Sequence, residues 1–195
     1  MTLTRMMMAV AAALILAGCL PVTTKTPAGT TAGLKNDAAL YGTWKGKNPD
    51  DKAAPDGFFH FMQAKNGGFD IALAMAQGSS DDGWSAFTAT TATLGKNHVL
   101  NAVMTYDKNA PVEGTLKNAN IPLLYVVKGR TLTLYLLDED KIKAAIKAGK
   151  IAGTVGTGDN GDAVITAGAA ELDGFLARPD AAQYFQRMFV LRKVD

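Results

Sequence analysis

Short stretches of alternating apolar and polar residues, separated by turn residues, dominate the chain from position 40 onward. Between Phe69 and Met75 the odd positions are bulky and apolar, whereas the even positions carry aspartate or alanine. A period of two is typical of strands that bury one face. The predicted strands of this region are Leu40–Lys47, Phe58–Ala64, Phe69–Gln77, Trp84–Leu94, Val99–Tyr106, Pro122–Lys128 and Thr131–Leu137.

The connections between these strands are rich in turn residues. Asn66-Gly67-Gly68 supplies residues that adopt positive φ, as hairpin turns require. Gly95–Asn97 and Lys128–Arg130 are similar tight connections. Because a parallel pair needs a crossover of a dozen or more residues, consecutive strands on tight turns must run antiparallel.

The pattern changes after position 137. Acidic residues precede the segment 141–149, in which Ile142 and Ile146 lie four positions apart, and lysines crowd its second half; this order suits a helix and its dipole. The remaining predicted elements are a helix over Ala169–Leu176, a last turn over Asp180–Tyr184 and a closing strand over Met188–Lys193. We therefore expect an all-β, antiparallel fold with one or two flanking helices near its C-terminal end.

The first twenty residues follow another pattern. Arg5 precedes a short apolar run, Met6–Leu16, which ends in small residues before Cys19, the only cysteine of the chain. A basic start, an apolar middle and small residues at the end are the layout of a secretory signal peptide. The run is about half of the roughly 20 apolar residues that a membrane-spanning helix needs, and Pro21 follows it.

Leu16-Ala17-Gly18-Cys19 resembles the lipobox of bacterial lipoproteins. That resemblance implies that residues 1–18 are a signal peptide removed before Cys19, whose thiol takes a diacylglyceryl group and anchors the chain in a membrane. Leu20 is not the aspartate that marks inner-membrane retention in that family, so the resemblance favours the outer membrane, facing the periplasm. The alternative, cleavage without lipid, leaves a lone thiol in an oxidising compartment.

Between Cys19 and Ala39 the chain is rich in Thr, Pro and Gly and has no hydrophobic period. Such composition is typical of a flexible linker. We therefore expect residues 19–39 to be an acylated cysteine and a flexible tether, and residues 40–195 to be the folded domain.

Charge and composition give no sign of catalysis or of a cofactor. The net charge is +2, so no basic excess predicts binding to nucleic acid. His60 and His98 are the only histidines, whereas a metal site usually needs three or four ligands at characteristic spacing. No serine lies in a Gly-x-Ser-x-Gly motif. We expect a non-catalytic protein without metal or cofactor.

Gly42-Thr43-Trp44, near the start of the first predicted strand, resembles the opening motif of the lipocalins and the wider calycin barrels. The resemblance implies an eight-stranded up-and-down barrel in which Trp44 packs at the closed end against an arginine of the closing strand; Arg192 is the first choice and Arg187 the second. Two features depart from the family: the helical insertion over 138–149, and the absence of its second motif, Thr-Asp-Tyr.

The same resemblance implies a cavity for a small hydrophobic ligand. Its expected lining is Trp44, Phe69, Ile71, Leu73, Met75, Leu132 and Leu134. Two alternatives stay open. Small barrels are often filled by their own side chains, which would leave a module that binds an envelope protein partner. An envelope hydrolase would instead need a cleft in which a histidine or carboxylate lies close to a hydroxyl group, and His60 is the residue to test.

Overall fold

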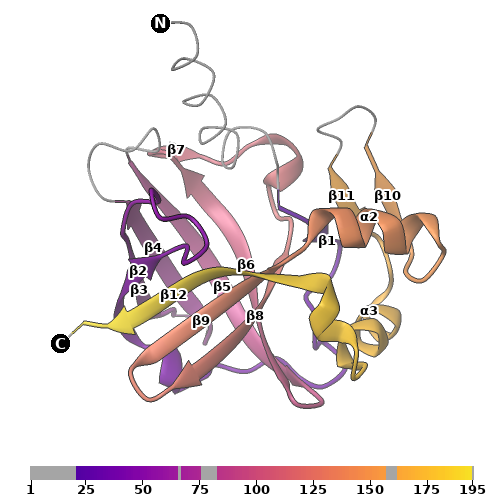
Figure 1. Cartoon of the computed structure of the whole chain (residues 1–195), viewed down its shortest axis with the longest axis horizontal. Helices are drawn as coiled ribbons and strands as arrows, with labels where there is room; N and C mark the ends of the chain where they lie inside the picture. The colour runs from indigo at the N-terminus through magenta and orange to yellow at the C-terminus, as the bar shows by residue number, and fades with distance from the viewer. Residues whose placement is uncertain (1–20, 66, 76–82, 157–161, 195) are drawn as a thin grey trace, which may run out of the picture.

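The computed structural model describes residues 21–65, 67–75, 83–156 and 162–194, and its main feature is a closed barrel of eight antiparallel strands (Figure 1). Each strand pairs with the next one along the chain, and the last pairs with the first. The eight strands are β2 (Gly42–Lys47), β3 (Gly57–Gln63), β4 (Phe69–Met75), β5 (Trp84–Leu94), β6 (Asn97–Asp107), β8 (Ile121–Lys128), β9 (Thr131–Leu137) and β12 (Phe185–Lys193). The all-β, up-and-down architecture predicted from the sequence is confirmed.

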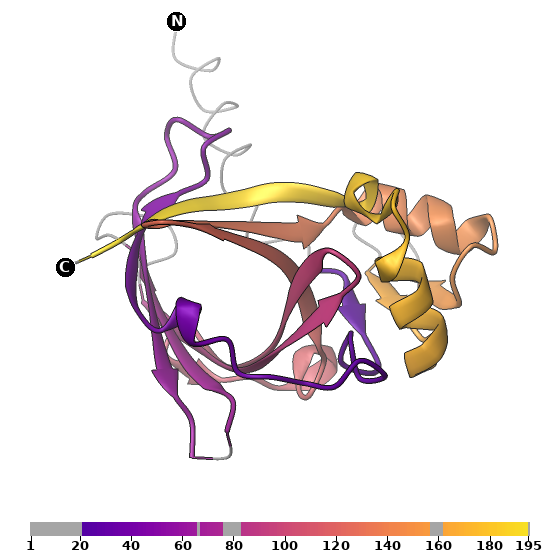
Figure 2. The ribbon, with the colours of Figure 1, turned by 90° about the horizontal axis from the view of Figure 1, so that it is seen from below.

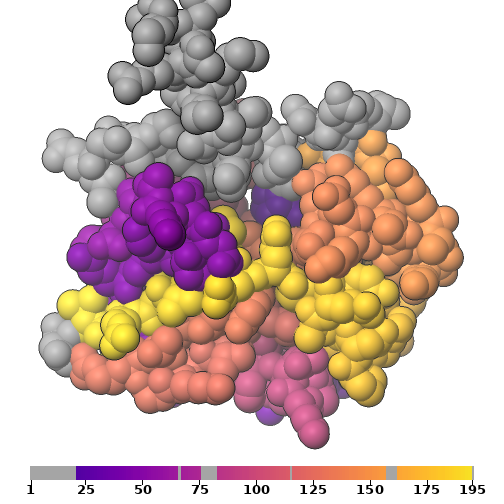
Figure 3. Space-filling model, viewed as in Figure 1, coloured from indigo at the N-terminus to yellow at the C-terminus, as the bar shows by residue number. Residues whose placement is uncertain are grey.

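The barrel closes where β12 inserts between β9 and β2. In the space-filling view the yellow strand crosses the molecule between the purple β2 region and the salmon β9 (Figure 3). A glycine permits the close approach, because a Cβ at Gly46 would lie 2.1 Å from the carbonyl oxygen of Val190. Closure leaves neither β2 nor β12 with an unpaired edge.

Helices cover the outside of the barrel on one side (Figure 2). The first, α2 (Glu139–Lys147), is capped by Asp138, whose carboxylate accepts a hydrogen bond from the Lys141 amide at 3.1 Å. The second is α3 (Ala169–Ala177), followed by the 3₁₀ turn η3 (Ala181–Tyr184). A small sheet of β1 (Thr23–Thr24), β11 (Ala163–Ile165) and β10 (Gly153–Val155) completes this side. Both predicted helices are therefore present.

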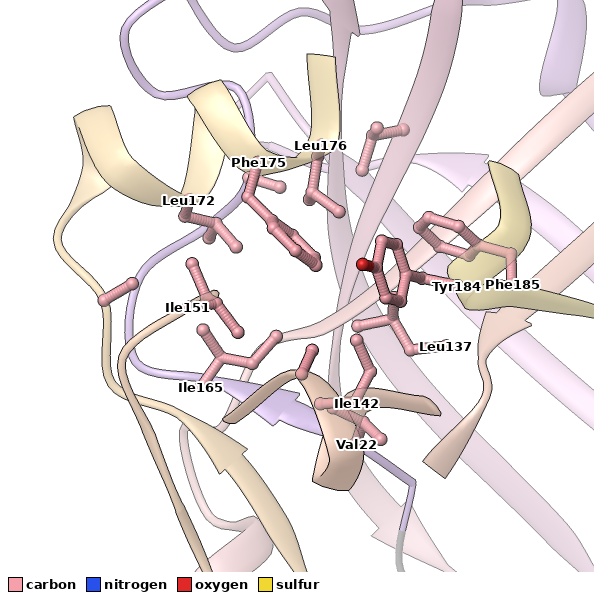
Figure 4. Packing of buried hydrophobic residues seen from close by; sticks show 14 of the residues in the cluster. Val22, Leu137, Ile142, Ile151, Ile165, Leu172, Phe175, Leu176, Tyr184 and Phe185 are labelled. Carbon is pink, nitrogen blue, oxygen red and sulfur yellow. The ribbon is translucent and has the colours of Figure 1, made fainter. Parts of the chain in front are cut away.

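Two apolar cores result, one on each side of the barrel wall. The barrel core fills the inside, whereas the outer core lies between the wall, the helices and the small sheet and includes Ile142, Leu172 and Phe175 (Figure 4). Successive residues of one strand serve different cores: Val99 of β6 belongs to the outer core and Leu100 to the barrel core. Strand alternation thus couples the two cores through shared backbone.

The segment predicted to be a flexible tether is packed where the structure describes it. Residues 21–37, called the strap below, run along the outer wall and lead into the 3₁₀ turn η1 (Ala38–Leu40). Val22 and Ala28 are buried in the outer core, and β1 pairs in parallel with β11. The folded domain therefore includes the strap and does not begin at residue 40.

The strap is held by hydrogen bonds rather than by an apolar stripe, which is why its composition suggests disorder. Asn101 on β6 accepts from the Ala28 amide at 2.7 Å and donates to the Ala28 carbonyl at 2.8 Å. The carboxylate of Asp173 on α3 accepts from the amides of Gly29 and Thr31 and from the Thr31 hydroxyl. Two buried polar side chains thus satisfy the backbone of a segment that has no hydrophobic period.

Candidate functional site

One end of the barrel is sealed by η1 and the residues around it. Leu40 and Trp44 are fully buried there, and the Trp44 indole nitrogen donates to the Leu40 carbonyl oxygen at 2.7 Å. Tyr125 donates from its hydroxyl to Asp37 at 2.7 Å, which ties β8 to the end of the strap. Burial, followed by the hydrogen bond to Asp37 and its negative charge, raises the pKa of Tyr125 well above its ordinary value. We call this end of the barrel the closed end.

The cation that covers Trp44 is Lys193, not Arg192 as the lipocalin resemblance implied. The ammonium nitrogen of Lys193 lies 5.2 Å from the centroid of the indole, and Lys193 is paired with Trp44 in the β2–β12 register. Arg192 is paired with Lys45 and is exposed, because successive residues of a strand face opposite sides. Arg187, the second choice, forms an exposed ion pair with Asp50 at 2.8 Å.

All seven residues predicted to line a ligand cavity belong to the inner wall of the barrel, but they divide into two groups. Five of them are almost completely buried in the barrel core: Trp44, Phe69, Ile71, Leu132 and Leu134. Leu73 and Met75, at the end of β4, keep part of their surface exposed. The half of the interior near the closed end is therefore filled by the protein's own side chains.

Apolar side chains at the other end of the inner wall are only partly buried. This group, called the apolar mouth below, comprises Leu73, Met75, Phe87, Leu123 and Phe189. Gly57 has no side chain to fill the space between them: a Cβ there would lie 3.2 Å from the sulfur of Met75 and 3.4 Å from Leu73. The mouth lies at the end opposite η1, where β4 ends and β5 begins.

Phe87, Leu123 and Phe189 were not predicted as lining residues. The alternation carries a signal for all three, because each lies two positions before a residue buried in the barrel core: Ala89, Tyr125 and Leu191. The strand register decides which alternate set faces inward, and that register is fixed by pairing across the barrel.

Among the described residues, the outside of the barrel has hollows, of which two are compared with the apolar mouth. One, of about 460 Å³, lies between the strap and the wall and includes Pro27, Leu34, Thr88 and Val103 in its lining. The other, of about 360 Å³, is lined by Pro21 and residues 23–25 of the strap and by residues 116–119. Neither is lined by the apolar mouth.

A threonine and a histidine lie together on the outer wall. The Thr43 hydroxyl oxygen is 2.7 Å from Nδ1 of His60, across the β2–β3 pairing. His60 is exposed, and neither hollow includes the pair. A histidine beside a hydroxyl was the signature predicted for a hydrolase, but this pair lies on an open surface of the barrel.

Other chemistry of the sequence falls partly outside the described residues. Cys19, the predicted site of lipidation, is not among them. Within the four described ranges, no group of three or more His, Cys, Asp or Glu side chains is arranged to hold a metal ion. The helices of those ranges are too short or too polar to cross a membrane.

No protein-family model matches this chain, and neither a curated protein nor a solved structure matches it significantly.

Proposed function

We propose that this chain is a non-catalytic lipoprotein of the cell envelope whose barrel takes a small hydrophobic ligand at the apolar mouth. The lipobox-like residues that end in Cys19 support the lipid anchor, and Leu20 supports the outer membrane, facing the periplasm. The resemblance of Gly42-Thr43-Trp44 to the opening motif of the lipocalins supports a ligand-binding barrel. The closed antiparallel barrel is compatible with that role.

The observation that carries the ligand proposal is the difference between the two barrel ends. Leu40 and Trp44 seal one end, whereas five inward-facing apolar side chains keep exposed surface at the other. Covering such surface is favourable by about 25 cal/mol per Å² of apolar area. Because the far half of the interior is packed, the ligand would occupy the mouth rather than a deep lumen.

Variants of the mouth test this proposal. Phe87→Ala and Phe189→Ala each remove part of its apolar surface, so we expect weaker binding of a fluorescent fatty-acid probe, measured by titration of the purified domain. Met62→Ala is the matched control, because Met62 is an exposed apolar side chain on the outer wall of β3. Equal affinities for the wild type and all three variants, with unchanged unfolding midpoints, would rule out the mouth as the site. Mass spectrometry of an organic extract should identify the natural ligand.

A second function, an interaction module with a filled barrel, is favoured by the packed interior near the closed end. It predicts that no apolar probe binds. It also predicts that crosslinking in intact cells joins the domain to one envelope protein at high yield.

The lipid anchor has its own test. Mass spectrometry of the N-terminal peptide should find a diacylglyceryl group and an acyl chain on Cys19, and the wild type should incorporate labelled palmitate. Cys19→Ser should abolish the incorporation. Incorporation that persists in this variant would remove the anchor from the proposal.

A further inference from the structure

Because the strap is packed from its first described residues onward, very few residues would separate a lipid on Cys19 from the folded domain. Val22 is only 2% exposed, and Thr23 and Thr24 are held in the small sheet by Val164 and Ile165. Cys19 precedes Pro21 by two residues, which span about 7 Å at most when fully extended. If Cys19 is acylated, as proposed above, the membrane surface must therefore lie close to the point where the strap begins.

The strap begins at the end of the barrel that carries the apolar mouth. The Thr24 amide donates to the Asn120 carbonyl oxygen at 2.8 Å, and Asn120 comes directly before β8. Pro21 lines the same hollow as Leu116, in the 3₁₀ turn η2 (Gly114–Leu116). That turn follows β7 (Ala110–Pro111), which pairs with the last residues of β6 (Figure 1).

Exposed aromatic side chains lie on the outer wall at the same end. Trp84 is 43% exposed and Tyr106 is 39% exposed, and their ring centroids are 5.1 Å apart. Phe58, also 39% exposed, lies in the same row, because Phe58 is paired with Ala74 and Ala74 with Trp84. We call Phe58, Trp84 and Tyr106 the aromatic rim.

Trp and Tyr are enriched where proteins meet the interface between water and lipid, because each combines a large apolar ring with a polar group. The segment next to the aromatic rim carries charges of both signs. Acidic Asp107 and Glu113 alternate with Lys108 and Lys117 along the turn between β6 and β8, and all four are exposed.

We propose that the aromatic rim rests in the headgroup layer of a phospholipid bilayer and that the apolar mouth opens toward that bilayer. The short distance from Cys19 to the packed strap sets this orientation, and the aromatic rim supplies the contact. A hydrophobic ligand would then pass between bilayer and barrel without crossing bulk water. This inference rests on the acylation of Cys19. It adds which face of the domain meets the bilayer and from which side a ligand enters the barrel.

Tryptophan quenching tests the orientation directly, because Trp44 and Trp84 are the only tryptophans. The acylated mature chain, which begins at Cys19, is reconstituted into phosphatidylcholine vesicles with bromine atoms near the top of the acyl chains. We expect the emission of Trp84 to be blue-shifted and most of it to be quenched. A Trp84→Phe variant gives the signal of the buried Trp44, which we expect to be unchanged.

Two controls separate the orientation from general adsorption. Val194→Trp in the Trp84→Phe background places an exposed tryptophan beside Thr43 near the closed end, and we expect no quenching there. A long Gly-Ser insertion between Leu20 and Pro21 keeps the lipobox-like residues and releases the domain from the surface. We expect this insertion to remove most of the quenching of Trp84.

The outcomes distinguish this inference from the proposed lipid anchor. Unmodified Cys19 in the mass spectrum contradicts the anchor itself. An acylated chain in which Trp84 is not quenched, or in which a tryptophan at 194 is quenched equally, overturns the orientation. Quenching that survives the Gly-Ser insertion overturns the role of the short connection. Shielding of Trp84 from acrylamide in native membranes but not in vesicles would indicate a protein partner and overturn the lipid contact.

Discussion

At the scale of single residues, alternation along β12 places two neighbouring cations on opposite sides of the barrel wall. Lys193 lies over the indole of Trp44, whereas Arg192 is exposed next to Lys45. A cation over an aromatic ring contributes about 0.5–1 kcal/mol at a site that is partly exposed.

The first prediction compares these two cations. We expect Lys193→Ala to lower the free energy of unfolding by about 0.5–1 kcal/mol. Arg192→Ala is the control and should change it by less than about 0.5 kcal/mol, as exposed substitutions usually do. Urea unfolding followed by intrinsic fluorescence measures both. Equal losses in the two variants would show that Lys193 does not stabilise Trp44.

Tyr125 gives the second prediction, which concerns pH. Its buried hydroxyl has a raised pKa in the folded protein, whereas the unfolded chain releases this proton near the ordinary value of 10.0. Neutral Tyr125 therefore makes its full contribution to the free energy of unfolding below about pH 10, and this contribution is lost as the pH rises further. We expect Tyr125→Phe to lose about 1 kcal/mol at neutral pH, because it removes one hydrogen bond, and to decline less steeply above pH 10.

Urea titrations of both proteins at several pH values between neutral and strongly alkaline measure these slopes. The difference between the two slopes gives the contribution of Tyr125 alone, because the lysines and the other tyrosines are common to both proteins. Parallel curves above pH 10 would contradict the raised pKa.

At the scale of elements, the strap depends on one buried carboxylate. Asp173 on α3 is 5% exposed and accepts three hydrogen bonds from Gly29 and Thr31. Hydrogen bonds to a charged group contribute about 1.5–3 kcal/mol each, and they are not additive when the partners act as a unit. The strap thus owes much of its order to a residue about 140 positions later in the chain.

The third prediction follows. Asp173→Ala should lower the free energy of unfolding by about 2–3 kcal/mol. It should also expose the amides of Gly29 and Thr31 to hydrogen exchange. Glu171→Ala on the same helix is the matched control, because the carboxylate of Glu171 accepts one exposed hydrogen bond, from the Ala152 amide at 3.0 Å. Unchanged protection of the strap amides in Asp173→Ala would show that other contacts hold this segment.

The elements that the sequence predicts are those whose burial follows a period. Every barrel strand and both helices were predicted because one face of each element meets a core. The strap has no such period: besides the short pairing of β1 with β11, contacts with Asn101, Asn120 and Asp173 hold it, and these partners are far from it in the sequence. The same reason explains why β10, in a glycine-rich segment, is not among the predicted strands.

The residues of the candidate site could also be predicted only in part. The alternation on β4 and β9 identified inner-wall residues such as Phe69 and Leu132, but it could not show which of them the core would bury completely. That distinction depends on residues outside the strands, such as Leu40 of η1, which is buried in the same core. The cation over Trp44 is Lys193 and not the expected Arg192 for a similar reason. A shift of one residue in the β2–β12 register moves a side chain to the other face of the strand.

At the scale of the whole molecule, the two cores lie on opposite faces of the same barrel wall. The outer core includes Val22 of the strap, Ile142 of α2 and Val99 on the outer face of β6, whereas Leu100 of the same strand belongs to the barrel core. Loss of the outer core would uncover the apolar outer face of strands whose inner face is still packed. We therefore expect the helices and the barrel to unfold together.

The last prediction tests this coupling with a substitution far from the reporter. Ile142 is fully buried in the outer core, so Ile142→Ala should cost about 2–5 kcal/mol. In the Trp84→Phe background the fluorescence of Trp44 reports the barrel core, and far-ultraviolet circular dichroism also reports the helices. Both signals should shift together to a lower urea midpoint, whereas Lys147→Ala, on the exposed face of the same helix, should leave the midpoint nearly unchanged.

If the circular dichroism changed at lower urea than the Trp44 signal, the helical side would unfold independently and the barrel would be a separate domain. Coincident curves would instead mean that the wall between the cores transmits the loss of a side chain on one face to the packing on the other.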